Sequence, residues 1–64
     1  MKEWIGKNIV VTLKDNSKYF GYVTDVKLIE NFNLFEVLLR DGMKVVFFFS
    51  EMIKIEELKD ERGE

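Results

Sequence analysis

The chain of 64 residues contains no cysteine, no histidine and no proline. Without cysteine no disulfide can form, and without thiolate or imidazole ligands a structural zinc site is not expected. The same absences remove nucleophilic triads and the most common general base, and the carboxylates are scattered over turns and the C-terminal end. We therefore expect a protein that is not an enzyme and has no metal, cofactor or small-molecule substrate.

Long apolar runs and clusters of basic residues are also missing. No apolar stretch approaches the roughly 20 residues that span a bilayer, and the N-terminus has no signal-peptide pattern, so we expect a cytoplasmic protein without a membrane role. Residues 1–50 hold seven Lys/Arg against six Asp/Glu, and residues 51–64 hold three against six. Strong binding to a duplex backbone needs clustered Lys and Arg, so duplex nucleic acid is not the expected partner.

What the chain does contain is a high proportion of β-branched and aromatic residues, which favours strands. The predicted strands are residues 8–14, 19–28, 34–40, 44–49 and 52–55, with turns at 15–18 and 41–42, a loop at 30–33 and one N-terminal helical turn at 2–6. The Asp-Gly pair at 41–42 predicts a two-residue hairpin. Short connections of this kind are typical of an all-β, five-stranded, strongly bent barrel of the SH3-like type. We expect it to occupy residues 1–55, followed by an acidic tail at 56–64.

The second predicted strand contains two irregular positions. Gly21 lies inside it, where a glycine usually marks a sharp bend or a close backbone approach. Tyr19 and Val23 share the face of Gly21, whereas Val26 has the opposite parity. The strand therefore either bulges near Asp25 or is apolar on both sides.

Residues 45–49 are apolar without interruption, although alternate side chains of a strand point to opposite faces. Only one of the two sets can enter the barrel, and burial of a Phe or Val side chain is worth about 1.5–3 kcal/mol. The other set is covered either by the N-terminal turn with Trp4 or by another copy of the chain. One short turn cannot cover this strand and the equally apolar strand 34–40, so we expect another copy.

Strands 44–49 and 52–55 are expected at the edges of the sheet, where strands pair readily with a neighbouring edge. If one edge pairs with the other edge of the next copy, the contact is head-to-tail and closes into a ring where the rotation permits. The residues predicted to lie in this interface are Val46, Phe48, Met52 and Ile53.

The order of these strands and turns resembles that of the Sm-like (LSm) family over residues 6–55. The segment GKNIVVTLKDNSKYFGYVTDV (6–26) is similar to the first Sm motif, and FNLFEVLLRDG (32–42) is similar to the third strand of the bacterial RNA-chaperone branch. The segment FFFSEMIKI (47–55) is loosely similar to the second Sm motif, with Phe48-Phe49-Ser50 in place of a Tyr-Lys-His signature. The resemblance implies an Sm-like barrel that assembles into rings and binds single-stranded RNA.

The resemblance also implies which residues contact RNA. Phe35 matches an aromatic residue that stacks on a base near the pore, and the full predicted set is Phe32, Asn33, Phe35, Phe49, Ser50 and Lys18. On the opposite face of the ring, the positions matching a second RNA site are Thr12, Asn16, Lys18 and Phe20. Packing in the core or in an interface is the alternative role for Phe32, Phe35 and Phe49.

Two functions therefore remain open. The first is a homo-oligomeric ring that binds single-stranded RNA, as an RNA chaperone or a scaffold in RNA metabolism, because aromatics beside amides can stack on bases. The second is an oligomeric SH3-like protein-interaction module that does not bind RNA. The net charge of −2 and the missing basic signature residues favour the second function.

Overall fold

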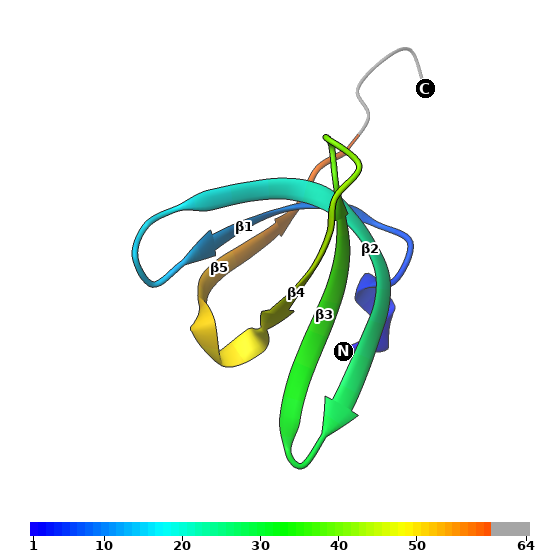
Figure 1. Ribbon diagram of the computed structural model, residues 1–64, viewed down its shortest axis with the longest axis vertical. Coiled ribbons are helices and arrows are strands. Elements are labelled where there is room, and N and C mark those ends of the chain that lie inside the picture. The colour runs from blue at the N-terminus through cyan, green and yellow to red at the C-terminus, as the bar shows by residue number, and fades with distance from the viewer. Residues whose placement is uncertain (60–64) are drawn as a thin grey trace.

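The computed structural model describes residues 1–59 and consists of five antiparallel strands in one sheet (Figure 1). In chain order the elements are the 3-10 helix η1 (Lys2–Trp4), β1 (Asn8–Leu13), β2 (Lys18–Ile29), β3 (Phe32–Leu39), β4 (Lys44–Phe48), the 3-10 helix η2 (Phe49–Glu51) and β5 (Met52–Glu57). The strand order is β4-β3-β2-β1-β5. The predicted all-β fold is confirmed, and so is the placement of β4 and β5 at the two edges.

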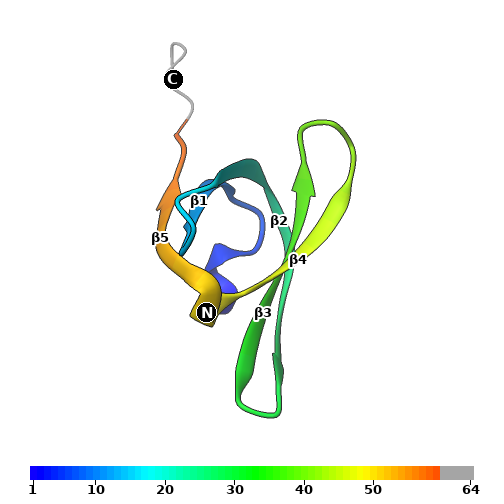
Figure 2. The same cartoon turned by 60° about the vertical axis from the view of Figure 1, so that its left-hand side comes forward.

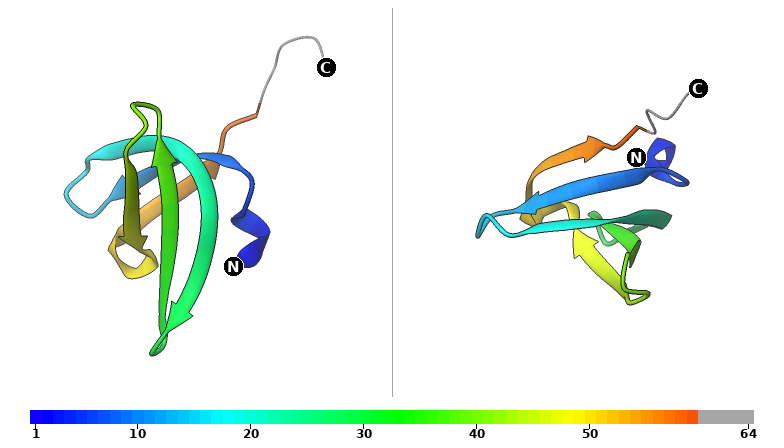
Figure 3. Two further views of the ribbon diagram at one scale, coloured as in Figure 1. Left: turned by 45° about the vertical axis from the view of Figure 1, so that its right-hand side comes forward. Right: turned by 90° about the horizontal axis from the view of Figure 1, so that it is seen from above.

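The long strand β2 holds the two halves of the sheet together. Its first part pairs with β1 and its second part with β3, and Gly21 and Tyr22 pair with both neighbours. The register with β3 shifts between Val23 and Asp25, so of the two alternatives left open for this strand the bulge is the one found. Because β2 bends, β1 and β5 form one layer and β3 and β4 the other (Figure 3), and the sheet curls into a barrel-like shape with η2 joining β4 to β5 (Figure 2).

The core lies between these two layers. Its buried side chains are Ile9, Val11, Val23, Val26, Phe35, Val37 and Phe47. Trp4 of η1 is partly buried and packs against this cluster. Strand β4 points Phe47 inwards, whereas Val46 and Phe48 remain 55% and 49% exposed. Only one face of β4 therefore contributes to the core of a single copy.

The β1–β2 and β3–β4 turns have the same construction. In the first, the backbone N–H of Leu13 donates to the carbonyl of Ser17, and Asn16 adopts a positive φ of 72°. Oδ1 of Asp15 accepts hydrogen bonds from the hydroxyl and the backbone N–H of Ser17, and these bonds lower the pKa of Asp15 below its usual value. Asn tolerates the left-handed conformation that this turn requires.

In the second turn, the N–H of Leu39 donates to the carbonyl of Met43, and Gly42 has a φ of +91°. The connection between the strands spans residues 40–43, so the predicted two-residue hairpin at 41–42 is wrong. Oδ1 of Asp41 accepts a hydrogen bond from the N–H of Met43, as Asp15 does in the first turn. The Asp-Gly pair forms the end of a longer turn because Gly42 supplies its only left-handed residue.

Two other predicted boundaries are also corrected. The chain reverses between β2 and β3 at Glu30 and Asn31, both with positive φ, so the predicted loop 30–33 is a two-residue turn. Phe32 and Asn33 consequently belong to β3. At the other end, β5 runs to Glu57 because it pairs with β1 as far as that residue. The predicted start of the acidic tail at 56 thus falls inside a strand, and residues 60–64 lie outside the described part of the chain.

Candidate nucleic-acid interface

The predicted RNA-binding residues do not form one site in a single copy of the chain. Phe35 is 0% exposed and lies in the core. A fully buried ring cannot stack on a base, so the structure corrects the stacking role predicted for Phe35. Phe35 lies on the central strand β3, opposite Val26 of β2 and Phe47 of β4, and packs with these residues in the core.

Phe32 and Asn33 lie at the start of β3 and point to opposite faces of the sheet. Phe32 is 54% exposed, and its ring centroid lies 6.1 Å from that of Phe48 on β4. Asn33 lines a hollow with Lys2 and Lys27 among its neighbours. These two residues therefore belong to different surfaces.

Phe49 and Ser50 lie on η2, which joins β4 to β5. The ring of Phe49 stacks on that of Phe35 at a centroid distance of 6.0 Å and an interplanar angle of 17°. Phe49 remains 37% exposed, and Ser50 is exposed. The stacking gives Phe49 a packing contact with the buried Phe35 ring.

Lys18 is the predicted residue that shares a face of its strand with exposed aromatic side chains. It begins β2, and the alternation of the strand places Lys18, Phe20 and Tyr22 on the same outward face. Their cross-strand partners on β1 are Thr12, Val10 and Asn8, respectively. Phe20 and Tyr22 are each 42% exposed. Strands β1 and β2 thus present two accessible aromatic rings beside a lysine, an amide and a hydroxyl.

Arg40 adds a second cation to this surface. Its guanidinium carbon lies 5.3 Å from the centroid of the Phe20 ring, within the range of a cation–π interaction. No ion pair of Arg40 or Lys18 is found within residues 1–59, whereas Lys27 pairs with Glu36 and Lys7 with Glu57. The hydrogen bond and the charge of Glu36 raise the pKa of Lys27 above its usual value. Both cations of the β1–β2 face are therefore available to an anionic partner.

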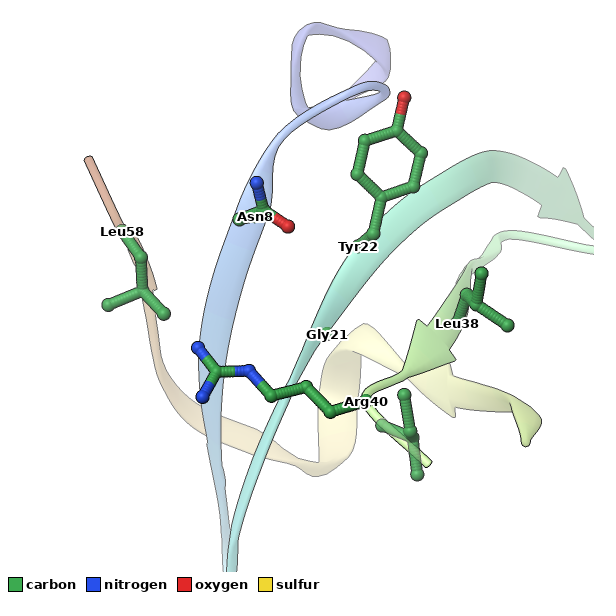
Figure 4. A pocket seen from close by; sticks show the side chains of 7 residues that line it. Asn8, Gly21, Tyr22, Leu38, Arg40 and Leu58 are labelled. Atoms are coloured by element: carbon green, nitrogen blue, oxygen red, sulfur yellow. The ribbon is translucent and has the colours of Figure 1, made fainter. Parts of the chain in front are cut away.

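A hollow of about 220 Å³ adjoins the same face (Figure 4). Its lining residues are Asn8, Gly21, Tyr22, Leu38, Leu39, Arg40 and Leu58. Tyr22 lies on one side of Gly21, and the Arg40 side chain extends on the other side across β2 towards β1 (Figure 4). The N–H of Leu58 donates to the carbonyl of Asn8, which holds the end of the described chain against β1. We call the surface formed by Lys18, Phe20, Tyr22, Arg40 and this hollow the aromatic–basic face.

The residues predicted from the resemblance include Lys18 and Phe20 of this face but not Asn8, Tyr22 or Arg40. A signal for Tyr22 is present in the alternation of KYFGY, residues 18–22, which places a cation and two aromatics on one face. Arg40 carries no such signal, because its position over Phe20 depends on the pairing of β2 with β3.

The predicted interface residues lie on both edges of the sheet. Val46 and Phe48 project outwards from β4, and Ile53 of β5 is 58% exposed at the irregular point of the β1–β5 pairing. Met52 differs from these three because it packs partly against the core. The apolar surface at each edge is thus available to another strand. Met52 instead packs against the core of its own chain.

The described part of the chain was also searched for a metal site and for a membrane-spanning helix. No group of three or more His, Cys, Asp or Glu side chains is placed to hold a metal ion within residues 1–59. No helix in that part of the chain is long and apolar enough to cross a membrane.

Comparison with family models, curated proteins and solved structures found no match to this chain.

Proposed function

We propose that the protein binds single-stranded RNA on its aromatic–basic face and does so as a homo-oligomer. The observation that carries this proposal is the row of Lys18, Phe20 and Tyr22 on β2, with Arg40 held over Phe20. Exposed aromatic rings next to cations are the usual platform for unpaired bases. Buried packing does not account for this row, because both rings are 42% exposed.

The physical roles of these residues differ. The Tyr22 ring provides a surface on which a base can stack, and the guanidinium of Arg40 covers the Phe20 ring and offers its own plane to the next base. Lys18 and Arg40 neutralise backbone phosphates. Two cations and a net charge of −2 are too little for a duplex backbone but suffice for a strand held mainly by stacking.

Self-association is proposed from the edges of the sheet. Strands β4 and β5 each have one side without a pairing strand within residues 1–59, and they carry the exposed apolar residues Val46, Phe48 and Ile53. Pairing of β4 with β5 of the next copy satisfies the backbone groups of both edges and covers these side chains. Such a head-to-tail contact repeats around a ring if the rotation closes.

Fluorescence anisotropy with a labelled oligouridine strand tests RNA binding. The variants Phe20→Leu and Tyr22→Leu keep an apolar side chain but remove the aromatic ring. We expect each to weaken binding about tenfold, since stacking on one aromatic is worth about 1–3 kcal/mol per base. Phe32→Leu is the control, because it removes a ring of an even more exposed residue, 54% against 42%, from β3 and should leave the affinity unchanged.

The outcomes separate the alternatives. Loss of binding in Phe32→Leu but not in the β2 variants would move the site to the start of β3. Absence of binding by the unmodified protein at low salt would contradict the RNA proposal. An oligomer that retains its size but binds no RNA would instead support a protein-interaction module.

A further inference from the structure

The hollow of the aromatic–basic face has the size of a small recognition pocket. Its volume of about 220 Å³ lies below the range of about 300–1,000 Å³ that holds drug-sized ligands. Gly21 of β2 lines it between Tyr22 on one side and Arg40 on the other (Figure 4). A single planar ring system therefore fits better than an extended ligand.

Hydrogen-bonding groups of two kinds border this hollow. Arg40 offers only donors, arranged as a planar fork, and Asn8 offers both a donor and an acceptor through its amide. Within residues 1–59 neither side chain forms a hydrogen bond or an ion pair. The contact with Phe20 restrains the guanidinium, so its donors are already placed beside the hollow.

The donor fork selects among the bases. Guanine presents two adjacent acceptors, O6 and N7, which match the two donors of an Arg fork. Adenine presents N7 beside an amino donor, so one donor of Arg40 would face another donor. The amide of Asn8 can adapt to either purine and therefore does not discriminate between them.

We infer that the hollow between Tyr22 and Arg40 takes a guanine base of the bound strand, with Arg40 reading O6 and N7. This specificity rests on the RNA binding proposed above and adds a base preference to it. The base lies beside the backbone at Gly21, and the Tyr22 side chain limits its position on the side away from Arg40. The remaining nucleotides stack on the rest of the face without a sequence requirement.

Anisotropy with three labelled oligouridine strands tests this inference. One strand carries a single guanine in the middle, one a single adenine and one a single 7-deazaguanine, which lacks the N7 acceptor. We expect the guanine strand to bind about tenfold more tightly than the other two, as for one bidentate pair. Arg40→Lys keeps the charge but loses the fork, so it should weaken binding of every strand and remove the guanine preference. Lys14→Gln, a charge change in the β1–β2 turn, should leave the preference intact.

The results distinguish this inference from the function on which it rests. If oligouridine binds but the three modified strands bind equally, guanine recognition is overturned and RNA binding stands. If no strand binds, both are overturned. A guanine preference that survives Arg40→Lys would also overturn the inference, because the preference would then come from another residue.

Discussion

A β carbon added to Gly21 would lie 2.5 Å from Cγ1 of Val37 and 2.7 Å from the carbonyl oxygen of Leu38. Strands β2 and β3 thus approach each other so closely at this point that only the hydrogen atom of a glycine fits in place of a side chain. The same glycine pairs with both β1 and β3, at the part of β2 that links the two halves of the sheet. The absence of a side chain at position 21 therefore allows β2 to lie this close to β3 where it links the two halves.

Substitution of this glycine should be costly. We expect Gly21→Ala to lower the free energy of unfolding by about 2 kcal/mol, since overpacking of a core typically costs about 1–3 kcal/mol. Urea unfolding at matched protein concentration measures the loss. In a Val37→Ala background the same change should cost less, but not zero, because the Leu38 carbonyl remains. Equal costs in the two backgrounds would show that Val37 does not create the restriction.

Gly42 provides a different test, because a glycine is favoured there by the left-handed backbone conformation and not by a lack of space. Its φ is +91°, and an added β carbon would meet nothing within 4 Å. We expect Gly42→Ala to destabilise the protein by about 1 kcal/mol through left-handed strain alone. Asn16 occupies the same place in the β1–β2 turn with a φ of 72°, so Asn16→Ala should have a similar cost and Asn16→Gly a small one. An unchanged unfolding midpoint in Gly42→Ala would contradict this account of the turns.

The β1–β2 turn also predicts a pH dependence. The hydrogen bonds from Ser17 lower the pKa of Asp15 in the folded protein, so its contribution to stability is present above the unfolded-state pKa of about 3.9. That contribution is lost as the pH falls through the lower, folded-state pKa. Thermal unfolding between about pH 5 and pH 2 should therefore be less pH-dependent in Asp15→Asn than in the unmodified protein. Parallel curves for the two proteins would contradict this role of Asp15.

Phe48→Glu tests the proposed contact between copies. Its side chain is 49% exposed on the edge strand β4, and a carboxylate placed in an apolar contact carries a desolvation cost. We expect this variant to dissociate into folded single chains in size-exclusion chromatography. Met43→Glu is the control, since Met43 is 59% exposed in the β3–β4 connection and outside the strand edge. An unchanged oligomer in Phe48→Glu would place the interface elsewhere.

Much of the fold follows from local patterns in the sequence. Alternation and turn residues locate all five strands, and the change of parity after Val23 marks the irregular part of β2, which the register shows to be a bulge. The uninterrupted apolar run at 45–49 correctly indicates that one face of β4 lies outside the core. The Glu30–Asn31 turn was harder to predict, because Glu rarely adopts a positive φ and no glycine marks the reversal.

The candidate site was less accessible to sequence reasoning, because it depends on register. Phe32 and Phe35 look alike in the sequence, yet the pairing of β3 leaves Phe32 exposed and buries Phe35 completely. Arg40 lies over Phe20 because the β2–β3 register pairs Gly21 with Leu39, so that the next residue after β3 comes to lie across from Phe20. Relationships of this kind arise from tertiary pairing, which strand propensity does not specify.

Sedimentation velocity with separate detection of the protein and a labelled oligouridine strand tests the proposed RNA-binding oligomer most directly. The account predicts that the protein sediments as a closed oligomer at dilute concentration and that the labelled RNA sediments with it. A well-folded single chain that leaves the RNA free would contradict both the edge-to-edge assembly and the RNA-binding role.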